Sequence, residues 1–122
     1  EEGNIFADCP WENDRKEAQA VAKHIGIEFD VLNLIDAYKE KIVAVLVDGY
    51  QNGVTPNPDI FCNRDIKFGV LLDYALAHGF DGIATGHYCQ KKLNENESYD
   101  LWEGADPNKD QSYFLALINQ HQ

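Results

Sequence analysis

Apolar residues recur every three or four positions in four stretches of the chain, which is the spacing of an amphipathic helix. The stretches cover roughly residues 13–25, 36–51, 63–78 and 111–119. Asp36 is a candidate cap for the second. A glycine follows each of the first three within two residues, and glycine commonly ends a helix. The pattern therefore predicts four helices.

Two short apolar runs lie between these helices, at 29–34 and 81–85. They are too brief for helices and are bounded by turn residues, so they predict buried strands. Strands that alternate with helices are typical of an α/β fold with a parallel sheet. The pattern changes over 88–104, where alternating residues flank a polar turn near 94–97 and predict a small hairpin.

Composition places limits on this fold. The 122 residues suit one domain, and no apolar run is long enough to span a membrane. Net charge is −11, which argues against a broad basic surface for nucleic acid. Three widely spaced cysteines indicate reduced thiols, and no Cys-x2-Cys pair supports a zinc site of Cys9, Cys62, Cys89 and His87. The sequence has no Met, so we expect an internal piece of a longer polypeptide.

The stretch Thr55–Phe68 carries the most chemistry. Pro58 favours an extended Asn57, so the loop should project Asn57 and Asp59 outward. If Asn63 caps the following helix, Cys62 lies at the helix mouth, where the dipole favours a thiolate.

A structural interpretation competes with the catalytic one for this stretch. Cysteine is often a core residue, and from spacing alone a structural Cys62 with a turn Asp59 is the more favoured reading. Lys67 could offset the charge of Asp59, or it could equally be a solvated lysine.

Two further blocks hold candidate ligand-binding residues. In 84–88, Gly86 allows close approach to the backbone and His87 can donate a hydrogen bond, although a tight turn explains both equally well. In 106–114, Lys109 and Gln111 at a helix entry could contact phosphate and base, while Asp110 or Ser112 caps the helix.

The three blocks occur in the order and spacing of one family. Thr55–Phe68, Ala84–Tyr88 and Lys109–Leu115 together closely resemble the tRNA-specific 2-thiouridylases (MnmA/TrmU). The resemblance covers essentially the whole chain. It implies that residues 1–122 are part of an N-type ATP pyrophosphatase domain, with a Rossmann-like parallel sheet of the adenine nucleotide alpha-hydrolase type.

The resemblance also implies an activity. Family members use ATP and Mg²⁺ to adenylate the wobble uridine of tRNA, and sulfur from a persulfide then displaces AMP to leave 2-thiouridine. The implied partners are tRNA and a sulfur-carrier protein or cysteine desulfurase, and the implied location is the cytoplasm. A thiol suits this chemistry because it is a soft nucleophile for sulfur transfer.

Residue roles follow from motif position in the resemblance. Cys62 resembles the catalytic nucleophile and Asp59 the acid/base residue beside the flipped-out uridine. The remaining positions resemble ligand contacts: Asn57, Pro58 and Asp59 for the target base, Gly86 for ATP, and His87, Lys109, Asp110 and Gln111 for tRNA. The resemblance assigns no metal ligand.

Two family features are missing from the printed sequence: the Ser-Gly-Gly-Val-Asp-Ser pyrophosphate loop and the second, persulfide-bearing cysteine. We therefore expect an incomplete sheet, and an isolated chain that is inactive and is marginally stable or self-associates. Two alternatives stay open. One is another ATP-pyrophosphatase synthetase, which would need no thiol at Cys62. The other is a non-catalytic module that binds tRNA or a sulfur carrier.

Overall fold

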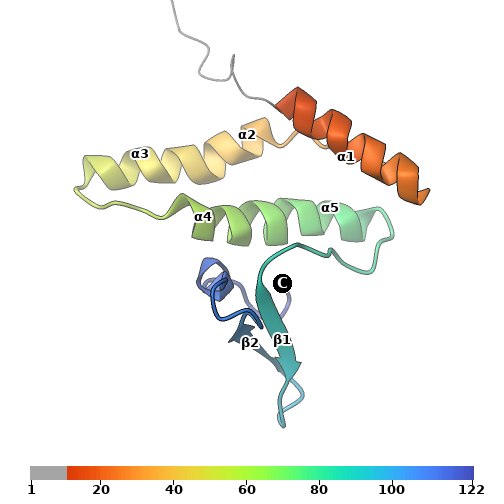
Figure 1. The fold of residues 1–122 in the computed structure, drawn as a ribbon. Coiled ribbons are helices and arrows are strands. Elements are labelled where there is room, and N and C mark those ends of the chain that lie inside the picture. The colour runs from red at the N-terminus through yellow and green to blue at the C-terminus, as the bar shows by residue number, and fades with distance from the viewer. Residues whose placement is uncertain (1–10) are drawn as a thin grey trace, which may run out of the picture. The chain divides into compact units, whose positions relative to one another are not determined.

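The computed structural model describes residues 11–122, so Cys9 lies outside the described residues. The chain divides into two compact units, residues 1–33 and 34–122. Figure 1 shows the elements of both. Over the described residues, no helix combines the length and apolar character that crossing a bilayer requires.

In the described part of the first unit, α1 (Trp11–Ile25) confirms the helix predicted over 13–25. Acidic residues stand in its first turn and basic residues in its last, the arrangement that the helix dipole favours. Gly26 ends the helix at φ 77°, a conformation that few side chains tolerate.

The strand predicted over 29–34 is not formed. Residues 27–34 have no regular secondary structure, and Val31 is 51% exposed. A strand exists through its hydrogen bonds to a neighbour, and no segment of the described chain pairs with this one. The prediction of a buried strand at 29–34 was therefore wrong.

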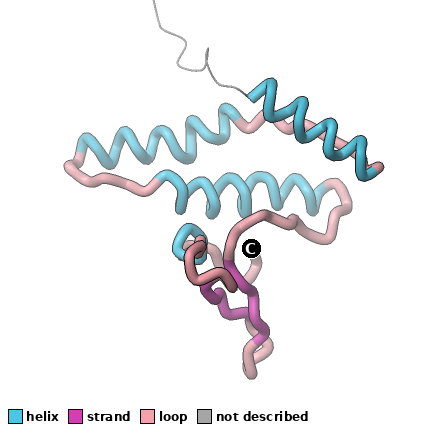
Figure 2. The backbone as a smooth tube through the Cα atoms, viewed as in Figure 1, coloured by secondary structure: helices cyan, strands magenta, loops and turns pink. Residues whose placement is uncertain are grey.

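The second unit contains two long helices (Figure 2). One consists of α2 (Ile35–Tyr38), η1 (Lys39–Val43) and α3 (Ala44–Gln51), and the other of α4 (Pro58–Phe61), η2 (Cys62–Leu71) and α5 (Leu72–Ala77). Both η1 and η2 are π-helical. Both predicted helices are thus confirmed.

The predicted caps of these helices were wrong. Leu34, not Asp36, is the first N-cap, and it makes no side-chain cap bond. The second helix begins at Pro58, five residues earlier than expected. Asn57 is its N-cap, and its Oδ1 accepts the N–H of Asp59 at 3.0 Å. Proline at the first helical position cannot donate a backbone hydrogen bond, so Pro58 starts the helix without loss.

The core of the second unit lies where the two helices run side by side (Figure 1). Ile42 of η1 is fully buried, and Ile66 of η2 and Ala75 of α5 are nearly so. Leu115, from the short 3-10 helix η3 (Ser112–Leu115), is also buried. The helix predicted over 111–119 is therefore only this four-residue turn.

Strands β1 (Cys89–Leu93) and β2 (Tyr99–Glu103) pair in antiparallel fashion and confirm the hairpin predicted within 88–104. The strand predicted over 81–85 is instead a loop. Within residues 11–122 there is consequently no parallel sheet, because neither candidate strand finds a neighbour.

Candidate functional site

A pocket of about 470 Å³ in the second unit brings the three sequence blocks together. The helix that consists of α4, η2 and α5 forms one wall. The loop before β1 and the entry to η3 form the others. The lining residues are Asp59, Cys62, Asn63, Lys67, Leu71, Thr85, Gly86, His87, Gln111 and Phe114. Each block thus contributes at least one of the predicted site residues.

Cys62 lies one turn inside the helix rather than at its mouth, because Asn57 and not Asn63 is the cap. The thiol is half-buried, and this burial raises its pKa above the ordinary value. Lys67 opposes the rise and Asp59 adds to it. The expectation that the helix mouth favours a thiolate here was therefore wrong, since burial outweighs the nearby cation.

Asp59 and Asn57 are both exposed, as the proline-rich loop predicted. The extended conformation of Asn57, with φ −94° and ψ 106°, confirms the effect of Pro58 on the residue before it. Asp59 lines the pocket, whereas Asn57 and Pro58 do not. The side chain of Asn57 is engaged as the helix cap.

Asn63 connects the three blocks through a buried amide that is only 3% exposed. Its Nδ2 donates to the carbonyl of Phe114 at 3.2 Å, which leaves Oδ1 to accept from Nε2 of His87 at 3.0 Å. The Thr85 hydroxyl lies 2.7 Å from Nδ1 of His87. Sequence reasoning missed this role of Asn63. The signal that could have found it is a polar residue at a position where the helix faces the core.

These contacts assign the state of His87. Nε2 donates to Oδ1 of Asn63. The Thr85 hydroxyl can donate to Nδ1 of a neutral ring or accept from a protonated one, and the lowered pKa of His87 favours the neutral Nε2–H tautomer. Burial lowers the pKa of His87, and Lys67 lowers it further. Both ring nitrogens are occupied within the chain, so a polar contact from His87 to tRNA would have to displace one of these partners.

Gly86 lines the pocket with open space beside its Cα. A Cβ added at this position would meet no atom within 4 Å. An approach of ATP to the Gly86 backbone, as the resemblance implies, thus fits the room that the structure provides.

The segment with Lys109, Asp110 and Gln111 is held against Tyr88. Gln111 donates its N–H to the Tyr88 carbonyl at 2.8 Å and accepts the Tyr88 N–H through Oε1 at 3.1 Å. Lys109 lies over the Tyr88 ring, with Nζ 5.4 Å from its centroid. Of the three, Gln111 alone lines the pocket.

Asp110 organises the same segment. Its Oδ1 accepts the N–H of Gly104 at 2.9 Å, and its Oδ2 accepts the Ser112 hydroxyl at 2.8 Å. The Ser112 hydroxyl, followed by the Gly104 N–H, lowers the pKa of the Asp110 carboxyl. The N-cap of η3 is Gln111, which makes no side-chain cap bond, so the prediction that Asp110 or Ser112 caps this helix was wrong. Asp110 is exposed, and its Oδ1 also accepts the backbone N–H of Ser112 at 3.2 Å.

Carboxylates are scarce around the pocket. Asp59 is the one acidic residue among the described lining residues. Over residues 11–122, no three His, Cys, Asp or Glu side chains gather in a metal-binding group. Cys89 is a free thiol outside the pocket, with its pKa raised by burial and then by Asp110.

A second hollow of about 640 Å³ lies in the first unit. Lys16, Gln19, Ala20, Lys23, Ile27 and Phe29 line it. None of the predicted site residues is among them.

Comparison with known proteins identifies the class to which this chain belongs. Residues 1–122 match the model of a family described as the tRNA methyl transferase HUP domain, and the chain belongs to that family. A HUP domain is a Rossmann-like α/β fold, to which the observed helices contribute. The resemblance noted in the sequence is thereby confirmed.

Individual relatives carry a more specific name. A tRNA-specific 2-thiouridylase MnmA of Akkermansia muciniphila is 53% identical over 118 residues, which are 97% of this chain and 33% of the relative. Proteins of the same name from Flavobacterium johnsoniae and Neisseria meningitidis are 49% and 46% identical. These cover 97% and 93% of this chain, and 31% of each relative. The chain thus spans about a third of the length of these curated relatives.

Proposed function

We propose that residues 1–122 are part of the ATP-pyrophosphatase domain of a tRNA 2-thiouridylase and carry its acid/base residue and its nucleophilic cysteine. The observation that carries this proposal is the convergence of Asp59, Cys62 and Gly86 on one pocket. Relatives named tRNA-specific 2-thiouridylase cover nearly the whole chain, which supports the same reading. The complete domain would hold the Rossmann-like parallel sheet.

ATP supplies a leaving group by adenylating the 2-carbonyl oxygen of a tRNA uridine. Persulfide sulfur then bonds to C2, and the C2–O bond breaks with departure of AMP. Cys62 completes the sulfur transfer: its thiolate attacks the inner sulfur of the persulfide, the bond between the inner and terminal sulfurs breaks, and the terminal sulfur stays on C2. The other product is a disulfide between Cys62 and the persulfide-bearing cysteine. The raised pKa of Cys62 means that the thiol must lose its proton during this step.

Asp59 is the acid/base residue in this proposal. It is exposed at the first turn of the helix and lines the pocket with Cys62. A carboxylate in this place can accept a proton while the flipped-out base occupies the pocket. Asn57 and Pro58, immediately before it, would contact the target base.

The tRNA contacts of the proposal are local, because the chain carries a net charge of −11. Lys109 is exposed and would contact tRNA phosphate, with His87, Asp110 and Gln111 shaping the same surface. Gly86 would meet ATP. The described residues offer no evident Mg²⁺ site, so the metal would rely on ATP phosphates and other residues of the enzyme. A sulfur-carrier protein or cysteine desulfurase would deliver sulfur in the cytoplasm.

A chimera tests this function. Residues 1–122 replace the matching segment of the A. muciniphila relative, and 2-thiouridine is measured by mass spectrometry after incubation with tRNA, ATP and a sulfur donor. Cys62→Ser and Asp59→Ala should each abolish the product. Cys89→Ser is the matched control and should retain activity, because Cys89 lies outside the pocket.

Full activity of the Cys62→Ser or Asp59→Ala chimera would remove that residue from the catalytic set. A chimera that carries residues 1–122 without substitution, and that is folded but forms no 2-thiouridine, would count against the catalytic proposal. A tRNA-binding titration against salt would then test the non-catalytic alternative, which requires an affinity that falls as salt rises.

A further inference from the structure

The helix segment that carries Cys62 is π-helical. Residues Cys62–Leu71 form η2, in which backbone hydrogen bonds join each residue to the fifth one along rather than the fourth. Such segments are rare and often occur at functional sites. The side chain five residues after Cys62 belongs to Lys67.

This winding decides which residues share a face. In an α-helix of 3.6 residues per turn, a residue five positions along lies about 140° around the axis and faces away. A π-helix winds more residues into each turn, so the fifth residue returns toward the starting face. Cys62 and Lys67 accordingly both line the pocket.

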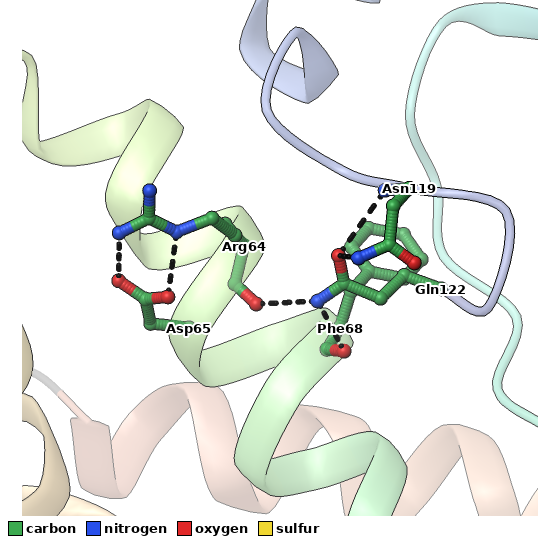
Figure 3. A network of polar contacts seen from close by, with 5 residues as sticks. All are labelled: Arg64, Asp65, Phe68, Asn119 and Gln122. Carbon is green, nitrogen blue, oxygen red and sulfur yellow. Dashed lines mark hydrogen bonds and ion pairs between the residues drawn. The ribbon is translucent and has the colours of Figure 1, made fainter.

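The last residue, Gln122, forms hydrogen bonds to the backbone of this helix. Nε2 of Gln122 donates to the carbonyls of Arg64 and Phe68, each at 2.9 Å (Figure 3). Asn119 holds the amide in place, because its Nδ2 and backbone N–H both donate to Oε1 of Gln122. These bonds stabilise the carbonyls of η2 in the register that brings Lys67 to the pocket.

Among the described residues of its helix, Lys67 forms no ion pair, whereas its neighbours Arg64 and Asp65 pair with each other. Arg64 donates two hydrogen bonds to Asp65, at 2.7 and 2.8 Å. The two side chains form an ion pair. The ammonium of Lys67 acts instead on two pocket groups, Cys62 and His87. Its field therefore falls on the proposed nucleophile.

We propose that Lys67 is the positioning residue that favours the thiolate of Cys62, and that the π-helix exists in part to bring the two side chains onto one wall of the pocket. The inference rests on the proposed role of Cys62 as nucleophile. Lys67 acts through the thiol.

Three titratable or charged groups face Cys62. Asp59 comes from α4, Lys67 from η2, and His87 from the loop before β1. His87 is the neutral tautomer held by Asn63 and Thr85, so it adds no net charge. Lys67 is consequently the one cation among the described lining residues, opposed by burial and by Asp59.

The test measures the thiol directly. The 122-residue chain carries Cys9→Ser and Cys89→Ser, and circular dichroism and gel filtration establish that each variant is folded and in the same oligomeric state. The chain is then alkylated with iodoacetamide from pH 6 to 10, and the pH profile gives the pKa of Cys62. Because the thiolate is the reactive form, Lys67→Gln should lower the rate at pH 7.5 about three- to tenfold, equivalent to a pKa rise of half to one unit. Lys67→Arg should restore the rate, and Asp59→Asn should increase it.

Lys91→Gln is the matched control, because Lys91 lies on β1 outside the pocket and should leave the profile unchanged. Salt provides a second readout: 1 M NaCl should reduce the difference in alkylation rate between the native chain and Lys67→Gln, because it screens the charge of Lys67. An unchanged profile in Lys67→Gln, or an equal change in Lys91→Gln, would overturn the proposal. The assay contains no tRNA or ATP, so its result is independent of whether the chain supports thiolation.

Discussion

The helix Pro58–Ala77 and the hairpin Cys89–Glu103 belong to the same unit but are stabilised in different ways. The helix buries Asn63, Ile66 and Ala75, and its polar contacts reach distant segments. The hairpin buries none of its strand residues. It depends on backbone pairing, on the turn around Asn94, and on lysines lying over aromatic rings.

The difference shows where this chain concentrates its chemistry. The pocket draws half of its lining residues from the helix and none from the two strands. Side chains held by burial and by buried hydrogen bonds keep a fixed geometry, which a reactive site requires. The effects of substitution should therefore be large in the helix and small in the hairpin.

The largest contrast should come from apolar truncation. Ile66→Ala removes a side chain that is 7% exposed, and we expect a loss of about 2–5 kcal/mol in the free energy of unfolding. Leu101→Ala on β2 removes a side chain that is 41% exposed and should cost much less. Urea unfolding followed by circular dichroism measures both. Equal losses would contradict the contrast between the two regions.

Two asparagines provide the next comparison. Asn63→Ala leaves Nε2 of His87 and the Phe114 carbonyl without their hydrogen-bond partner at a part-buried place, and should cost about 1–3 kcal/mol. Asn94→Ala removes turn bonds to Asn96 and Ser98 that water can replace, so the loss should be smaller. The same unfolding experiment decides, and a larger effect at Asn94 would refute the ranking.

The pH dependence of stability should reflect His87. Its pKa in the folded chain lies below 6.5, so the unfolded chain binds the proton more readily. The stability that His87 contributes is fully present above pH 6.5 and is lost as the pH falls through its folded pKa. His87→Gln should flatten this part of the profile between pH 7 and 5. A slope unchanged by the substitution would show that other groups cause it.

The smallest effect should belong to the surface of the hairpin. Nζ of Lys92 lies 3.8 Å from the centroid of the Trp102 ring. At an exposed site such a contact contributes roughly 0.5–1 kcal/mol, so Lys92→Ala should lower stability by no more than that. Trp102 fluorescence during thermal unfolding reports the change. A loss of stability as large as that of Ile66→Ala would contradict this, because it would require a buried core under the hairpin, whose strand side chains are not buried.

Local pattern was a good guide to some elements and not to others. The helices ending at Gly26, Gly53 and Gly79 were predictable, because periodicity and glycine stops act within a few residues. The hairpin followed from alternation and a polar turn. The predicted strands at 29–34 and 81–85 failed because a strand depends on a neighbour elsewhere in the chain, which an apolar run does not reveal.

For the site, the sequence by itself determined the chemical groups: a carboxylate and a thiol three residues apart, a glycine beside a histidine, and a polar triplet at a helix entry. Tertiary structure decided how they are used. Burial raised the pKa of Cys62 where a helix mouth would have lowered it. Asn63 forms hydrogen bonds to the His87 ring and to the Phe114 carbonyl, and no rule of sequence spacing predicts either bond. The π-helix places Lys67 on the pocket wall with Cys62, since the direction of a side chain depends on how the backbone is wound and on what packs against it.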